Sequence, residues 1–221
     1  MSAFGIAPVG GLGDESIVNF NVPGFLWGGE SYTSIAVDSN GYIVVGGGSS
    51  SDNNCCEPAL PNAAPPNNVI APYWTDLSLD PASGGGAVRV GTLTDGTTSW
   101  LVVDYAKVRP YESALENSFQ IWIQLGSTEG TWLSYGDIGG ANNQPLVVGA
   151  ENRTGTSGID RETAASNTEY AITTSPPVFS TASYTVTFRA LFPGKNTVAT
   201  TLRSPVFKGT AIASTTIDVT R

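Results

Sequence analysis

Three residues in one short stretch, Tyr73, Trp74 and Asp76, are the first candidates for a ligand site. Aromatic side chains offer flat apolar faces for stacking, and a carboxylate accepts hydrogen bonds from hydroxyl groups. Together they predict a ledge at the end of a strand that binds carbohydrate. The alternative is that the two rings pack in the interior and Asp76 caps the turn that follows.

The tryptophans raise the same question for the rest of the chain. Residues 119–125 alternate in polarity, so their apolar side chains share one face and Trp122 lies on the other. Trp122 is therefore the best candidate for an exposed stacking ring. The alternative is that it packs in the core, as most large aromatic residues of a sandwich do. Sequence alone does not show whether any of the other tryptophans share its face; they are Trp27, Trp74, Trp100 and Trp132.

Oxygen ligands for a structural Ca²⁺ ion are offered by Asp76 and Asp80, with Asp52, Asn53 and Asn54 as further candidates. They do not form an Asp-x-Asp-x-Asp-Gly loop, and loop solvation is the alternative. Ca²⁺ is the only cofactor that the sequence suggests.

Two further chemical features are local. Cys55 and Cys56 are adjacent, and neighbouring Cα atoms lie about 3.8 Å apart, below the usual disulfide window of roughly 4.4 to 6.8 Å. A vicinal disulfide, free thiols and links to other chains all remain open, and in an oxidising setting we expect a bonded state. Asn152 begins the glycosylation sequon Asn-Arg-Thr.

Composition argues against an enzyme. The chain has no histidine, which removes the commonest general base and metal ligand. A glycosidase needs two facing carboxylates at a fixed separation, and ion pairs with nearby cations explain the remaining strand carboxylates as well; these are Asp104, Glu112, Glu116 and Glu151. We expect no catalytic residues.

Charge and hydropathy limit the partners. The net charge of −9 argues against nucleic acid, because phosphate binding needs clustered Lys and Arg. No run approaches the roughly 18 apolar residues of a membrane span. The first thirteen residues lack the basic start of a signal peptide, so a secreted protein would have lost its leader.

The elements that position these residues are strands. Two hairpins are predicted, one around Asp38-Ser39-Asn40-Gly41 and one around Thr94-Asp95-Gly96-Thr97. A first strand over residues 14–22 should stop at Pro23, and the long connection 46–66 should be a surface loop. The class is all-β, a two-sheet antiparallel β-sandwich of jelly-roll or immunoglobulin-like type. The predicted core includes Val69, Ile70, Trp100, Val102, Phe119, Ile121, Ile123, Val147 and Val148.

A second region follows the prolines at 176 and 177. Residues 176–221 carry 5 basic and 1 acidic side chain, against 5 and 18 in residues 1–175. Three strands are expected at 184–190, 197–203 and 210–219, too few to bury two faces. We expect a partial immunoglobulin-like segment that docks on the body, adds a strand to another copy, or meets a further domain.

Four motifs in order carry a family resemblance: Tyr32 to Gly48, Asn67 to Leu77, Asn117 to Ile123, and Val148 to Arg153. They resemble a β-rich accessory domain that follows the catalytic domain of secreted bacterial subtilisin-like serine peptidases and related cell-surface proteins. The resemblance covers residues 13–175, and Cys55-Cys56 departs from it. It implies a non-enzymatic extracellular or cell-surface module whose partners are other domains or copies of the protein. A filament or surface-layer subunit and a module that binds cell-surface glycan are the alternatives.

Overall fold

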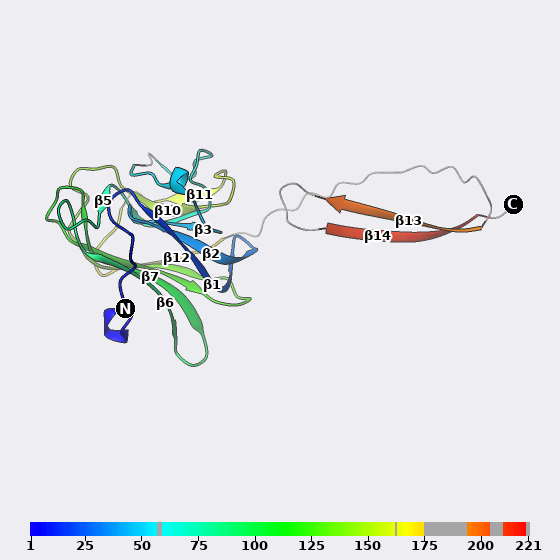
Figure 1. Ribbon diagram of the computed structural model, residues 1–221, viewed down its shortest axis with the longest axis horizontal. Coiled ribbons are helices and arrows are strands. Elements are labelled where there is room, and N and C mark those ends of the chain that lie inside the picture. Colours follow the sequence, from blue (N-terminus) through cyan, green and yellow to red (C-terminus); the bar gives the residue numbers. More distant parts are fainter. Residues whose placement is uncertain (57–58, 162, 175–193, 204–209, 220–221) are drawn as a thin grey trace. The chain divides into compact units, whose positions relative to one another are not determined.

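The computed structural model describes residues 1–56, 59–161 and 163–174, together with the backbone of two strands at 194–203 and 210–219 (Figure 1). The chain divides into two compact units, Met1–Val178 and Phe179–Arg221. Helix in the described part is limited to two single 3-10 turns, Ser2–Phe4 and Ser50–Asp52. No described helix is long and apolar enough to cross a membrane.

The first unit contains two antiparallel sheets, which confirms the predicted all-β class. The first sheet has the order β1 (Ile17–Trp27), β2 (Glu30–Asp38), β3 (Ile43–Val45), β4 (Val69–Trp74), β10 (Val147–Glu151), β11 (Gly158–Asp160). The second has the order β12 (Glu169–Ile172), β9 (Thr131–Ile138), β8 (Asn117–Gln124), β7 (Ser99–Pro110), β5 (Leu77–Ser78), and β6 (Ala87–Thr94) also pairs with β7.

The main core lies between these sheets. Tyr73 of β4 stacks on Phe119 of β8 with ring centroids 5.3 Å apart, and Tyr105 of β7 stacks on the same ring at 4.8 Å. Alternation along β8 buries Phe119, Ile121 and Ile123 and turns the residues between them outward. The face assignment predicted for this strand is confirmed.

A smaller core lies on the opposite face of the first sheet, beneath the connection between β3 and β4. Leu60 of that connection is buried against Tyr42, Val69 and Trp74. The Asn54 backbone fixes the connection, because its N–H donates to the Tyr42 hydroxyl (2.9 Å) and its carbonyl accepts from Trp74 Nε1 (2.8 Å). The predicted loop is present, and it covers a sheet face.

Both predicted hairpins form. The strands β2 and β3 pair around Asp38 to Gly41, and β6 and β7 pair around the Asp-Gly turn, where Asp95 Oδ1 accepts hydrogen bonds from the N–H groups of Thr97 and Thr98. These turns form as predicted because their signals are local.

The end predicted for the first strand is wrong. β1 continues past Pro23 to Trp27, and its pairing with β2 shifts between Asn21 and Phe25, so residues 22–24 lie opposite Thr33. A bulge leaves residues outside the ladder, and proline has no N–H to donate there. The chain therefore accommodates Pro23 without ending the strand.

The second unit contains a hairpin of β13 (Gly194–Arg203) and β14 (Thr210–Val219), paired antiparallel over their whole length. The strand predicted at 184–190 lies outside the described residues. The predicted boundary after residue 175 and the docking of this segment remain predictions.

Candidate ligand-binding face

The structure bears out the alternative given for the two aromatic residues of this stretch, which pack in the interior and form no ledge. Tyr73 and Trp74 are 0% and 1% exposed, so neither offers a face to a ligand. Strand β4 is covered on both sides, since Tyr73 packs on Phe119 and Trp74 packs on Tyr42 with ring centroids 4.2 Å apart.

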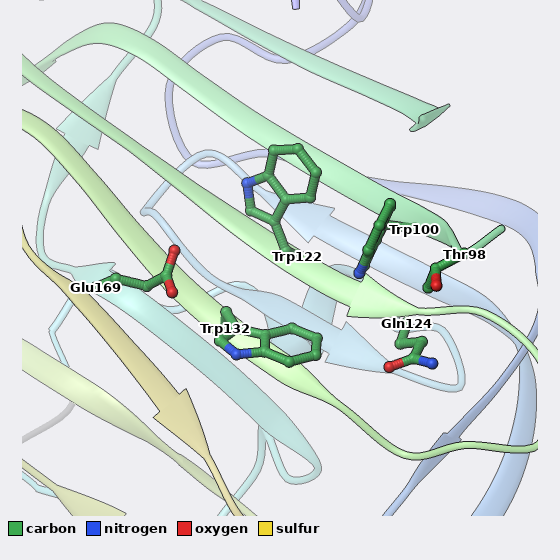
Figure 2. A pocket seen from close by; sticks show the side chains of 6 residues that line it. All are labelled: Thr98, Trp100, Trp122, Gln124, Trp132 and Glu169. Carbon is green, nitrogen blue, oxygen red and sulfur yellow. The ribbon is translucent and has the colours of Figure 1, made fainter. Parts of the chain in front are cut away.

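Three other tryptophans gather on the outer face of the second sheet. Trp100, Trp122 and Trp132 are each partly exposed, and they line a shallow depression of about 300 Å³ together with Thr98, Gln124 and Glu169 (Figure 2). Trp122 is partly exposed on the outer face, as the alternation indicated. Trp100, predicted in the core, is half-buried on this outer face.

Strand register explains the grouping. Trp122 of β8 lies directly opposite Trp132 of β9, and Trp100 of β7 lies opposite Gln124. Side chains directly opposite each other on one face have Cβ atoms about 4.5 to 5.5 Å apart. The Trp100 and Trp122 rings meet edge to face, with centroids 6.1 Å apart and planes at 72°. The three rings therefore lie on one face of three adjacent strands and line the same depression.

A hydrogen-bonded relay fixes the central ring. Trp122 Nε1 donates to Gln120 Oε1 (2.8 Å), and Gln120 Nε2 donates to Asp104 Oδ1 (2.8 Å). Asp104 Oδ2 lies 3.7 Å from both Arg89 Nη1 and the Met1 amino group. Because the indole N–H is satisfied within the protein, the exposed ring surface is held in one orientation for a ligand.

The structure does not bring the predicted calcium ligands Asp76 and Asp80 together in one site. Asp76 lies with Asp14 and Glu15, and one carboxylate oxygen of each falls within 4.8 Å of the others. Burial raises the pKa of Glu15, and the charges of Asp76 and Asp14 add to the increase. Asp80 is not in this group, because its Oδ1 accepts a hydrogen bond from Ala82 N (2.9 Å) and caps a turn. The predicted pair, Asp76 and Asp80, is therefore not a shared site.

Both local features from the sequence lie near the first sheet. Cys55 and Cys56 form a vicinal disulfide in the connection that covers the sheet. Asn152 Oδ1 accepts hydrogen bonds from the N–H groups of Thr156 and Ser157 and so closes a turn. Glycosylation of Asn152 remains a prediction.

Asp38 is a buried acid that the sequence did not single out. It is 0% exposed and accepts hydrogen bonds from Asn40 N (2.9 Å) and Asn53 Nδ2 (3.0 Å). Burial raises the pKa of Asp38 to about 8 despite these donors. Its place at the end of an apolar strand before an Asn-Gly turn was a signal only for a turn, so its burial could not be foreseen.

The fold and this face define a two-sheet β-sandwich module with an open aromatic surface. The family model described as NIDO related matches residues 9–200, and the chain belongs to this family. The family indicates an extracellular type of module. No curated protein and no solved structure matches the chain. The resemblance to peptidase accessory domains is not addressed by the family match and stays a hypothesis.

Proposed function

We propose that this chain is a non-enzymatic module of a secreted or cell-surface protein, and that it binds carbohydrate on its tryptophan face. The observation that carries the proposal is the grouping of Trp100, Trp122 and Trp132 on one partly exposed surface. A contiguous exposed apolar patch rimmed by polar residues is a mark of an interaction site on a soluble protein. The extracellular family agrees with a glycan partner.

The polar residues beside the rings suit a sugar better than an apolar peptide. Thr98, Gln124 and Glu169 line the depression next to the indoles. Binding sites commonly combine aromatic walls with a few polar groups that fix orientation. A pyranose ring presents C–H groups on its face and hydroxyls around its edge, which matches this arrangement.

Support for a non-enzymatic role comes from composition and from the partners of the acids. The chain has no histidine. Asp104 belongs to the relay that holds Trp122, and Glu116 pairs with Arg109 (2.7 Å) and Lys107 (3.3 Å). These contacts give both carboxylates structural roles.

A glycan array probed with the full-length chain, followed by calorimetry on the hits, tests the proposal. We expect Trp122→Ala and Trp132→Ala to weaken binding by about tenfold or more each, with the fold retained. Leu115→Ala is the matched control, since Leu115 is an exposed apolar residue outside the depression. Wild-type protein that binds no glycan, or alanine variants that bind as wild type, would contradict the proposal.

Self-assembly by strand addition is a second candidate function. In the described part of the second unit, β13 and β14 pair only with each other, so each strand has an edge with no described partner. Such edges accept strands from other chains, and a head-to-tail contact that does not close makes a filament. Light scattering of the full chain across a salt series is the test, and a monomer at low salt, where screening is weakest, excludes this function.

A further inference from the structure

One side chain gives the tryptophan face its charge. Glu169 of β12 is exposed, and among the residues that the structure describes it is the only charged one that lines the depression. Figure 2 shows its carboxylate directed toward the side of the depression formed by Trp122 and Trp132. Its strand position explains this, because Glu169 pairs with Ser134, two residues beyond Trp132 on the outer face of β9. A ligand lying on these rings would thus have a carboxylate beside it.

No described basic side chain neutralises that carboxylate. Residues 1–174 contain five basic side chains, and each one has a partner elsewhere. The partners are Asp104 for Arg89, Glu116 for Lys107 and Arg109, Glu30 for Arg153, and the ring of Tyr170 for Arg161 at 4.0 Å. Tyr170 packs on the core residue Tyr135, so alternation puts it on the opposite face of β12 from Glu169.

The rings favour the same sign of ligand charge as the carboxylate does. The face of an indole attracts cations, and tryptophan is the strongest aromatic partner for them. Three indoles and one carboxylate at the same depression therefore attract a positive group and repel a negative one. A neutral sugar would receive only the stacking contribution.

We propose that the tryptophan face selects oligosaccharides with free amino groups, of the glucosamine type, over N-acetylated, neutral or acidic ones, and that Glu169 determines this selectivity. The inference rests on the carbohydrate binding proposed above. The protonated amine lies against an indole and near the Glu169 carboxylate, while the rest of the ring stacks. Acetylation removes the positive charge and adds an acetyl group to an unchanged sugar ring, so the comparison of wild type with Glu169→Gln is what isolates the effect of charge.

The test measures the affinity of the full-length chain for a chito-oligosaccharide hexamer in its deacetylated and fully acetylated forms, by calorimetry at low salt and about pH 5.5, where the sugar amines are protonated. We expect the deacetylated hexamer to bind about tenfold more tightly, which combines one cation–π contact with one exposed ion pair. Glu169→Gln should lower this ratio to about two- to fourfold, because the variant removes the ion pair and keeps the cation–π contact. Asp137→Asn, an exposed carboxylate of β9 outside the depression, should leave the ratio as in wild type.

The outcomes separate this inference from the proposed function. Equal affinity for the two hexamers, or tighter binding of the acetylated one, overturns the selectivity and leaves carbohydrate binding standing. A ratio that Glu169→Gln does not change, or that Asp137→Asn lowers equally, overturns the role of Glu169. Absence of binding to both hexamers and to every glycan on the array overturns the proposed function itself.

Discussion

Trp74 and Trp122 lie in the middle strands of the two sheets, but they differ in how far their side chains are exposed to solvent. Trp74 is 1% exposed, because the connection between β3 and β4 covers the outer face of the first sheet. Trp122 lies on the outer face of the second sheet, where it lines an open depression. An aromatic residue in a strand of this sandwich can therefore be structural or can bind a ligand, depending on whether another segment covers the outer face of its sheet. Four predictions test whether the covering segment accounts for the difference between the two tryptophans.

Trp74→Ala should give the largest effect, a loss of about 3 to 5 kcal/mol in the free energy of unfolding. The variant removes the ring that packs on Tyr42 and the donor to the Asn54 carbonyl. Urea unfolding followed by circular dichroism measures the change. Trp132→Ala serves as the comparison and should cost about 1 kcal/mol or less. Equal losses in the two variants would remove the distinction between the two sheets.

The Asp38 carboxyl should make the region around the covered face less stable at high pH. Because its pKa is raised to about 8 in the folded protein, Asp38 binds its proton more tightly there than in the unfolded chain. Its contribution is complete below about pH 4 and is lost as the pH rises through about 8, on the order of a few kcal/mol. We expect the stability of wild type relative to Asp38→Asn to fall across this range.

Asp95→Asn provides the control of opposite sign for that experiment. Hydrogen bonds from the N–H groups of Thr98 and Thr97 lower the pKa of Asp95. Its stabilisation is therefore present above the unfolded pKa and is lost only as the pH falls into the acid range. A wild-type difference from Asp38→Asn that stays constant from pH 4 to 9 would show that Asp38 titrates normally.

On the open face, double replacement of Trp122 and Trp132 by alanine should weaken glycan binding by less than the product of the two single losses and should change stability little. Trp122 of β8 lies directly opposite Trp132 of β9, so one ligand would contact both rings. The losses of binding free energy in the two single variants should therefore not be additive. Calorimetry on both single variants and the double variant measures the coupling. Additive losses would indicate two separate binding positions on the face.

Gln120→Ala should give the smallest effect, a reduction of affinity of about two- to fivefold. Gln120 contacts Trp122 through its Oε1 and Asp104 through its Nε2, and it does not line the depression. Losing it frees the indole, so tryptophan fluorescence anisotropy should fall together with the affinity. Unchanged anisotropy with lower affinity would mean that Gln120 acts by another route.

Sequence predicted the features that depend on neighbouring residues. Both hairpins and the alternation of β8 follow from turn chemistry and period-two patterning. The burial of the aromatic side chains was harder to predict, because Tyr73 and Trp74 are buried by segments far away in the chain. The grouping of Trp100, Trp122 and Trp132 depends on the register of three strands, and register is set by long-range pairing. Of the three tryptophans, only Trp122 had a sequence pattern that indicated its outward orientation, because it lies between Ile121 and Ile123 in an alternating strand.

The bulge in β1 has a consequence for how this molecule avoids aggregation. β1 is one edge of the first sheet, and its bulge at residues 22–24 carries Pro23. The opposite edge strand, β11, spans only Gly158–Asp160. A proline, a bulge and a short strand each hinder the edge of a sheet from pairing with a strand of another chain. Both edges of the first sheet, β1 and β11, are thus poor sites for strand addition. We therefore expect assembly through strand pairing to use an edge outside this sheet.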